Sequence, residues 1–298
     1  MPTPTIVLHL GAHKTATSHL QKSLQRNGTA LERMGVSFLP PAHYRQTFAS
    51  LQIELRDGAD IENLRRTAKH LVRGAANGKR RLILSDENIM GNMPRLMKEN
   101  DIYPWARGRV GRTVRILSYY RPEICLAVRN LAGFIPSAYG EALRHAPYRS
   151  FERFVSNADL HALSWARLIG KLASAARETK FFVWRYEDYD AHKTDILQAL
   201  LNAACPDDFD FVGKRTRPGL SARALEALAD WSAKGHDIRG ERLIGKAEEL
   251  YPTGEEWPPF DPFTPNQRAI FDANYQRDWD EIKAMPDVAA FHAQTAMN

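Results

Sequence analysis

The sequence predicts a parallel α/β fold, and three observations carry this prediction. Short apolar runs alternate with helix-like stretches over the first two thirds of the chain. Most of these runs lack strict alternation of polar and apolar residues, which is typical of strands covered on both faces. Beyond about residue 206 helical patterns continue, and we expect no further strand. Alternating strands and helices favour a parallel sheet with right-handed crossovers.

Apolar runs that end at a turn or a helical pattern are predicted to form the sheet. They are Thr5–Leu10, Val36–Leu39, Arg81–Ser85, Glu123–Arg129 and Lys180–Trp184. Helix-like stretches between them are Thr17–Arg33, Ile61–Ala75, Ile135–Arg144, Ala162–Arg177 and Lys193–Ala203. Later helical patterns cover Leu220–Ala233, Arg239–Leu250 and Pro265–Ala284. We therefore predict a single domain over residues 1–298, with an α/β core at about 5–206 and a helical C-terminal extension at about 207–298.

Composition is that of an ordinary globular protein, with 44% hydrophobic and 26% charged residues. No run of about 20 apolar residues predicts a membrane span, and no signal peptide is expected. Two distant cysteines, Cys125 and Cys205, form neither a metal motif nor a disulfide framework, which favours a cytoplasmic protein. The net charge of +6 suits anionic partners. Basic residues are spread along the chain without an aromatic stripe, so specific nucleic-acid binding is not expected.

A loop rich in hydroxyl groups follows the first predicted strand. It covers Gly11–Ser18 (GAHKTATS), and a helical pattern begins at its end. Backbone N–H groups and the dipole at a helix N-terminus favour an anion, and Lys14 adds a full positive charge. Helix capping explains one hydroxyl, but it does not explain three hydroxyls together with a lysine. The sequence therefore predicts a phosphate-binding loop.

This loop departs from the Walker A motif, which requires G-x-x-x-x-G-K-[ST]. His13 precedes Lys14, and Gly11 lies only three positions upstream. A second anion-binding pattern follows later, where Arg129 ends the fourth predicted strand and Ser137 lies eight residues further on. A guanidinium and a hydroxyl suit a phosphate monoester, and open α/β sheets bind ligands at the carboxyl ends of their strands.

Together these residues resemble the PAPS-dependent sulfotransferases of bacterial type, in which G-x-x-K-T-[GA]-T-[ST] follows a strand. The resemblance implies a P-loop NTPase-like sulfotransferase fold, the donor PAPS (3′-phosphoadenosine 5′-phosphosulfate), the product PAP and no metal. It implies that Lys14 contacts the bridging oxygen and assists departure of the nucleotide. It also implies that the 5′-phosphate is held by Thr15, Ala16, Thr17 and Ser18.

The same resemblance implies that Arg129 and Ser137 bind the 3′-phosphate of the donor. Ala16 stands where many relatives have glycine, so a positive φ at this position would cost strain. Lys214–Ser221 (KRTRPGLS) occupies the place of a basic or polar loop, from which Arg215 or Arg217 would close over the 3′-phosphate. A solvated basic turn explains that segment equally well.

The resemblance covers about residues 5–225 and includes a further segment, Trp184–Asp188 (WRYED). We expect this segment to be structural, with Tyr186 and Glu187 tying the edge of the sheet to neighbouring helices.

Sulfuryl transfer needs a base that takes the proton of the acceptor. Bacterial relatives often read S-x-E after the third strand, where this chain has Ser85-Asp86-Glu87. The resemblance therefore implies Glu87 as the base, with His13 as the alternative. A structural alternative is a helix-start cluster, in which Ser85 or Asp86 caps the helix and Glu87 complements its dipole.

Two other functions stay open at this point. One is a P-loop kinase or NTPase, because Leu82–Glu87 (LILSDE) resembles a Walker B strand with carboxylates for Mg²⁺. The missing G-K step argues against it, and Arg129 with Ser137 has no role in it. The other is a non-catalytic protein that binds nucleotides or anionic polymers. For a sulfotransferase, the acceptor would be a small molecule or carbohydrate with a hydroxyl or amine, and glycolipids and phenols also stay open.

Overall fold

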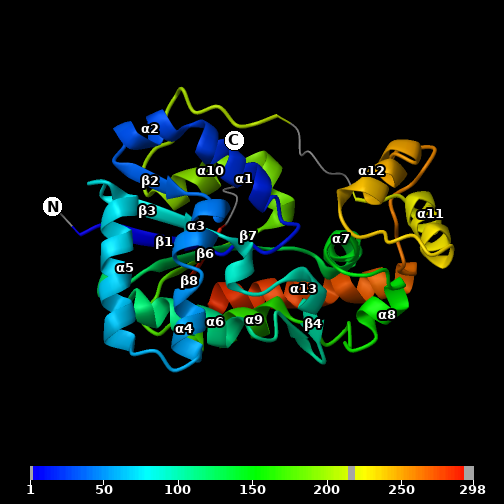
Figure 1. Ribbon diagram of the computed structural model, residues 1–298, viewed down its shortest axis with the longest axis horizontal. Helices are drawn as coiled ribbons and strands as arrows, with labels where there is room; N and C mark the ends of the chain where they lie inside the picture. The colour runs from blue at the N-terminus through cyan, green and yellow to red at the C-terminus, as the bar shows by residue number, and fades with distance from the viewer. Residues whose placement is uncertain (1–2, 214–218, 292–298) are drawn as a thin grey trace.

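The computed structural model describes residues 3–213 and 219–291. Its centre is a six-stranded sheet with the order β2-β3-β1-β6-β7-β8, in which every neighbouring pair is parallel (Figure 1). The strands are β1 (Thr5–His9), β2 (Val36–Leu39), β3 (Arg81–Ser85), β6 (Glu123–Val128), β7 (Phe181–Arg185) and β8 (Val288–Ala290). The predicted parallel α/β class is confirmed, and the ends of the predicted strands lie within one residue of those observed.

The prediction that no strand follows residue 206 is wrong. β8 follows the last helix and pairs with β7 from Phe181↔Val288 to Val183↔Ala290. It has only three residues, two of them alanines, which are depleted in strands, so only pairing with the edge of the sheet identifies it as a strand. A small antiparallel hairpin of β4 (Met97–Lys98) and β5 (Asp101–Ile102) was not predicted for the same reason.

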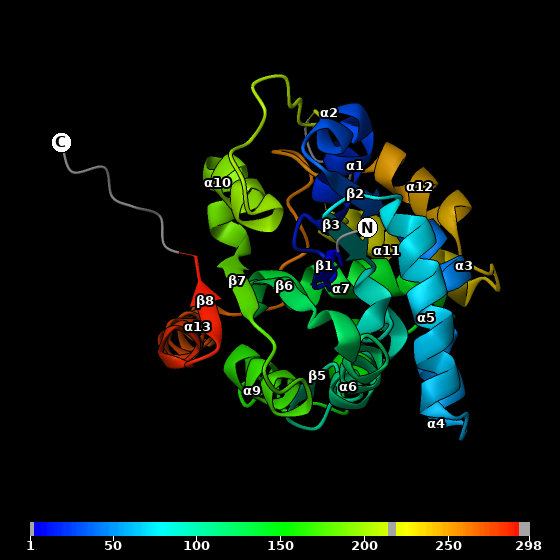
Figure 2. The same cartoon turned by 90° about the vertical axis from the view of Figure 1, so that its left-hand side faces the viewer.

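Helices cover both faces of the sheet (Figure 2). One face packs against α1 (Thr17–Arg26), α2 (Gly28–Arg33) and α10 (Tyr189–Leu201). The opposite face packs against α5 (Ile61–Ala76), α6 (Ala106–Ile116) and α9 (Trp165–Ala175). In α5 the buried residues Leu64, Ala68 and Val72 recur every four positions, which aligns them as one apolar stripe.

Several helices differ from their predicted bounds. The expected helix Thr17–Arg33 is divided at Asn27, whose side-chain amide donates to Ser23 O at 2.7 Å and to Asp210 O at 2.8 Å. α7 (Leu131–His145) begins earlier than expected, because the Asn130 side chain accepts from the Ala132 N–H and caps it. Helices absent from the prediction are α3 (Pro41–Thr47), α4 (Leu51–Arg56), α6 and α8 (Phe151–Val155).

The C-terminal region adds α11 (Ala222–Ala233), α12 (Glu241–Leu250) and α13 (Pro265–Ala284). α13 matches its predicted bounds, because Thr264 and Gln267 form a capping box around Pro265. Buried Arg144 of α7 forms ion pairs with Glu241 and Glu248 of α12, which fastens this region to the core. Within residues 3–213 and 219–291, no helix is both long and apolar enough to cross a bilayer.

The order in which strands are added to the sheet reverses at β1, which lies between β3 and β6. From β1 the chain runs to β2 and β3 on one side, and then crosses to β6 on the other. Ligands of open α/β sheets bind in the crevice where such connections diverge. The loop after β1, the turn after β3 and the start of α7 all lie at this edge, so the topology brings the predicted site residues together.

α13 holds the N-terminus of α9 through Asp278. The carboxylate accepts from the Ser164 hydroxyl at 2.7 Å and from the Trp165 N–H at 2.6 Å. The Trp165 indole in turn donates to Arg129 O at 2.7 Å, so this contact supports the end of β6.

We predict that Asp278→Ala lowers the free energy of unfolding by about 1–3 kcal/mol, because a buried acceptor of two hydrogen bonds is lost. Urea unfolding monitored by circular dichroism measures this change. Asp280→Ala on the exposed side of the same helix is the control and should leave the midpoint nearly unchanged. Equal effects of the two substitutions would contradict the role given to Asp278.

Candidate functional site

In the loop between β1 and α1, two threonine hydroxyls bind one carbonyl group of the same loop. The Thr15 hydroxyl donates to Ala12 O at 2.6 Å, and the Thr17 hydroxyl donates to the same oxygen at 3.0 Å. Lys14 and Ala16 have φ values of 61° and 63°, in the left-handed region. The strain expected at Ala16 is therefore present, since an L-residue pays about 1–2 kcal/mol for this conformation.

Four consecutive amide groups of the loop lack a hydrogen-bond partner within the described protein. Within the described residues, the N–H groups of Thr15, Ala16, Thr17 and Ser18 donate to no acceptor. The first N–H groups of a helix lack intrahelical partners, and the α1 dipole places partial positive charge beside them. Successive N–H groups in such a turn form a concavity that binds anions. The backbone of the loop is thus suited to a phosphate.

The hydroxyl groups of the loop have different surroundings. Thr15 and Thr17 are buried, and their protons are engaged by Ala12 O. Ser18 is exposed in the first turn of α1. The spacing of the hydroxyls in the sequence could not distinguish the two that brace the loop from the one that faces solvent.

Arg129 joins the end of β6 to this loop. Its Nη1 donates to Lys14 O at 2.7 Å, and its guanidinium lies 4.3 Å from the centre of the Tyr186 ring. It also packs on the first turn of α7, where a Cβ at Gly133 would lie 3.3 Å from Nη2. The structure therefore brings together Lys14 and Arg129, which lie far apart in the sequence.

The face of α7 that begins at Gly133 continues along the loop. Lys14 Nζ donates to Glu141 Oε2 at 3.3 Å. Gly133, Ser137 and Glu141 are four residues apart and share one helix face, so half-buried Ser137 lies between the Arg129 and Lys14 contacts.

The ion pair between Lys14 and Glu141 is largely buried, with 19% and 17% of the two side chains exposed. Burial lowers the pKa of Lys14, and Glu141 opposes this shift. Burial acts to raise the pKa of Glu141, but Lys14 and Arg144 outweigh it, so the pKa lies below its ordinary value. Glu141 was not predicted as a site residue, although its position one turn after Ser137 was a usable signal.

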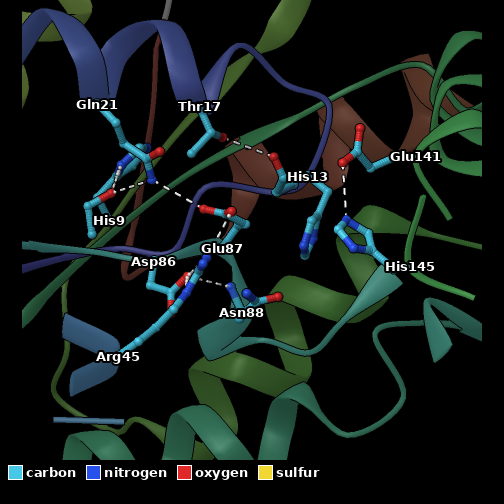
Figure 3. Close-up of polar contacts among 12 residues, drawn as sticks. His9, His13, Thr17, Gln21, Arg45, Asp86, Glu87, Asn88, Glu141 and His145 are labelled. Atoms are coloured by element: carbon cyan, nitrogen blue, oxygen red, sulfur yellow. Dashed lines mark hydrogen bonds and ion pairs between the residues drawn. The ribbon is translucent and has the colours of Figure 1, made fainter. Parts of the chain in front are cut away.

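Asp86 and Glu87 have separate roles after β3 (Figure 3). Buried Asp86 accepts three hydrogen bonds from Arg45, the shortest at 2.6 Å, and its Oδ1 also accepts from the Asn88 N–H at 3.1 Å. It thereby caps the 3₁₀ turn at Glu87–Ile89, as the structural alternative expected of this cluster. Burial raises the pKa of Asp86 even though Arg45 opposes this shift.

Glu87 instead faces the loop and α1. Its Oε2 accepts from the Gln21 amide at 3.2 Å, and its Oε1 lies 3.2 Å from Nη2 of Arg45. Burial acts to raise its pKa, but His13, the backbone, Gln21 and Arg45 outweigh burial, so the pKa of Glu87 lies below its ordinary value. Glu87 is therefore an ionised carboxylate beside the loop.

A buried hydrogen-bond chain extends from Glu87 to the end of β1. Gln21 Nε2 also donates to Ser85 Oγ at 3.0 Å, and Ser85 Oγ lies 2.8 Å from His9 Nδ1. Burial lowers the pKa of His9 to about 4, so this imidazole is neutral. The chain holds the amide of Gln21 in one orientation and thereby fixes the carboxylate of Glu87.

His13 lies between Glu87 and the Glu141–His145 pair (Figure 3). His13 is 9% exposed, and burial lowers its pKa, so the imidazole is neutral at neutral pH. Its Nδ1 lies 2.8 Å from the hydroxyl of Tyr103, a residue that the sequence analysis did not identify.

The segment Trp184–Asp188 contains both structural and site residues. Glu187 accepts from the Asn130 N–H at 3.0 Å and from the Tyr275 hydroxyl at 2.7 Å, so it ties β7 to α7 and α13 as expected. Tyr186 packs against the guanidinium of Arg129 and so contributes to the site. The predicted residues Arg215 and Arg217 lie outside the described residues.

Comparisons with known proteins give weak likenesses. No family model and no curated protein matches the chain. Similar solved structures include a sulfotransferase from Alicyclobacillus acidocaldarius, with 16% identity, 84% of this chain and 96% of that chain covered, and a TM-score of 0.44. Mouse sulfotransferase SULT7A1 complexed with PAP has 13% identity, with 96% of this chain and 86% of that chain covered, and a TM-score of 0.42. The sulfotransferase domain from the curacin biosynthetic pathway has 13% identity, with coverage of 92% and 98% and a TM-score of 0.39. At these values the likenesses assign no role to any residue of this chain.

We predict opposite effects on stability for two substitutions in the loop. A Cβ at Gly11, whose φ is 41°, would lie 2.4 Å from Thr17 Cγ2, so Gly11→Ala should cost roughly 2 kcal/mol or more. Ala16→Gly relieves left-handed strain and should stabilise the protein by about 0.5–1 kcal/mol, after the added freedom of the unfolded chain is subtracted. Urea unfolding curves measure both changes, and destabilisation by Ala16→Gly would contradict the loop geometry.

Proposed function

We propose that this protein is a sulfotransferase that moves a sulfuryl group from PAPS to a hydroxyl or amine of an acceptor and releases PAP. The observation that carries this proposal is the pairing of two anion-binding elements. The open amides of Thr15–Ser18 form one of them, and Arg129 with Ser137 forms the other. A donor with a 5′-phosphosulfate and a separate 3′-phosphate needs both elements, whereas ATP has no 3′-phosphate.

In the proposed reaction the acceptor oxygen or nitrogen attacks sulfur, and the bond from sulfur to the bridging oxygen of the 5′-phosphate breaks. PAP departs with that electron pair, and the acceptor proton passes to Glu87. Lys14 exchanges Glu141 for the bridging oxygen, where its charge stabilises the negative charge that develops on the leaving group. The loop amides and Ser18 hold the 5′-phosphate. Arg129 and Ser137 hold the 3′-phosphate, and we propose that Arg215 or Arg217 closes over it.

Glu87 suits the base better than its neighbour does. Glu87 lies beside the loop that carries Lys14, and a pKa below the ordinary value leaves its carboxylate ionised at neutral pH. Asp86 is 1% exposed and accepts three hydrogen bonds from Arg45, the shortest at 2.6 Å, whereas Glu87 accepts one from Arg45 at 3.2 Å. A base must reach the proton that it removes, and Asp86 would first have to leave Arg45.

The same contacts weigh against a kinase or NTPase. The Walker B interpretation assigns Asp86 to Mg²⁺, but this carboxylate is bound by Arg45. A non-catalytic nucleotide binder would not require an ionised carboxylate beside Lys14. Charged side chains surround Lys14 and its neighbour His13: Glu141, Arg144 and Arg129 act on Lys14, and Glu87 and Arg45 act on His13. We therefore favour a polar acceptor, either a small molecule or a carbohydrate.

Titration calorimetry with PAP in EDTA tests the proposal. PAP should bind without added metal, because the loop amides, Lys14 and Arg129 supply the positive charge. Lys14→Ala should abolish turnover of PAPS, since the leaving oxygen loses its cation. No heat from PAP in EDTA, together with binding of ATP and Mg²⁺, would favour the kinase instead.

We predict that Arg129→Ala weakens PAP binding by about 10- to 150-fold. A charge-assisted hydrogen bond contributes roughly 1.5–3 kcal/mol, and about 1.4 kcal/mol corresponds to a factor of ten. ADP lacks the 3′-phosphate and should bind the variant nearly as well as the wild type. Calorimetry with the two nucleotides measures the difference. Equal losses for PAP and ADP would mean that Arg129 acts through its bond to Lys14 O and supports only the fold.

We predict that Glu87→Gln lowers turnover by about 10²- to 10⁴-fold, which is the usual contribution of a general base. Glutamine keeps the size of the side chain but removes its basicity, so the affinity for PAP should stay almost unchanged. Steady-state kinetics with labelled PAPS and calorimetry with PAP measure the two quantities. Asp86→Asn is the matched control, because the kinase alternative makes Asp86 at least as important. Near-full turnover by Glu87→Gln would show that the base lies elsewhere, and unfolding of the variant would show a structural role.

A further inference from the structure

Tyr103 holds His13 by two hydrogen bonds to a single oxygen. The His13 backbone N–H donates to Tyr103 Oη at 2.9 Å, and His13 Nδ1 lies 2.8 Å from the same atom. Tyr103 is 2% exposed and His13 is 9% exposed, so water has little access to either contact. Both residues are therefore fixed relative to each other.

The backbone of Tyr103 is itself constrained. Tyr103 follows β5 with a φ of 52°, which a bulky residue rarely adopts, and its N–H donates to Leu96 O at 2.7 Å. Strained residues of this kind are kept only where the surrounding structure holds them, and they cluster at functional sites. The phenol thereby contacts His13 from a segment ninety residues away in the chain.

The two hydrogen bonds fix the direction of the tyrosine proton. Tyr103 Oη accepts from the His13 backbone N–H, and burial raises the pKa of Tyr103, so the phenol keeps its proton. Within the described residues, the acceptor in contact with this hydroxyl is His13 Nδ1. If Nδ1 carried a proton, the buried phenol O–H would have no acceptor, which costs about 1–3 kcal/mol. Nδ1 must therefore be unprotonated, and the proton of a neutral His13 lies on Nε2.

We infer that Tyr103 sets the tautomer of His13, so that Nε2–H donates a hydrogen bond to the transferred sulfuryl group while Glu87 accepts the proton of the acceptor. Tyr103 is then a positioning residue that acts through His13. That the sulfuryl group accepts this hydrogen bond depends on the proposed function. The tautomer of His13 does not depend on it, because it is a property of the unliganded protein.

This assignment separates the two candidate bases. A base needs a free lone pair, but the Nδ1 lone pair of His13 is occupied by the tyrosine proton and Nε2 is already protonated. Donors aimed at the oxygens where charge develops stabilise a transition state without moving a proton. The charged groups that face His13 are Glu87 from the turn after β3, Glu141 from α7 and Arg45 from α3. Burial keeps the pKa of His13 below its ordinary value despite the two carboxylates and a hydrogen bond with the Asn88 side chain. Because Tyr103 occupies Nδ1, Asn88 is the partner of Nε2–H in the unliganded protein, and the sulfuryl group would replace it when the donor binds.

Nuclear magnetic resonance of ¹⁵N-histidine-labelled protein tests the tautomer without substrate. His13→Gln assigns the His13 signals by their disappearance. At neutral pH we expect the proton on Nε2 and an unprotonated Nδ1 that accepts a hydrogen bond. Tyr103→Phe should shift the Nδ1 resonance and let the Nδ1–H form appear, whereas Tyr44→Phe, another buried tyrosine, should change neither signal. A wild-type proton on Nδ1, or a Tyr103→Phe variant with an unchanged Nδ1 resonance, overturns the inference.

Turnover of PAPS tests the role of the donor. Glutamine places an amide N–H near the position of Nε2 but cannot act as a base, so His13→Gln should lower kcat by no more than about tenfold. His13→Ala removes the donor and should lower kcat by about 10²- to 10³-fold, the usual effect of losing such a group. Equal losses in the two variants would make His13 the base and overturn the inference. If wild-type protein transfers no sulfuryl group at all, the proposed function fails, and the resonance experiment alone decides the tautomer.

Discussion

The hydrogen bond from Arg129 to the carbonyl of Lys14 joins the two halves of the candidate site. Arg129 lies at the end of β6, and Lys14 lies in the loop after the neighbouring strand β1. The carbonyl of Arg129 is held in turn by the indole of Trp165, whose backbone N–H is held by Asp278 of α13. The position of the arginine therefore depends on helices packed beneath the sheet. A guanidinium fixed in this way is directed at one place in the crevice and costs little to order when a phosphate binds.

Among the described residues, the cations at the loop, Lys14, Arg45 and Arg129, have anionic or carbonyl partners within the protein. Lys14 contacts Glu141, and Arg45 binds Asp86 and Glu87. Such pairing lowers the cost of burying these charges before a ligand arrives. The donor would have to replace Glu141 at Lys14, whereas the open loop amides need no exchange. In the proposed reaction the backbone provides the affinity for phosphate, and the exchange at Lys14 places its charge on the oxygen that leaves.

The central strands and the meeting of Lys14 with Arg129 could be predicted, because carboxyl ends of parallel strands share one edge of the sheet. The start of α13 could also be predicted, because it depends on the neighbouring residues Thr264 and Pro265 alone. Tertiary contacts determine the rest: β8 exists through its pairing with β7. Tyr103 and Arg45 reach the site from segments whose local sequence carries no motif, so no spacing rule could find them. The different surroundings of Asp86 and Glu87 likewise depend on Arg45, which makes three hydrogen bonds to Asp86 and one to Glu87.

A crystal structure of the protein with PAP tests the central claim most directly, because it locates both phosphates in one experiment. We expect the 5′-phosphate to accept hydrogen bonds from the amides of Thr15–Ser18, and the 3′-phosphate to lie within hydrogen-bonding distance of Arg129 and Ser137. Lys14 should have left Glu141 and point toward the oxygen to which sulfur was attached, on the side of Glu87. A 3′-phosphate directed away from Arg129, or a nucleotide bound outside the loop, would contradict the account.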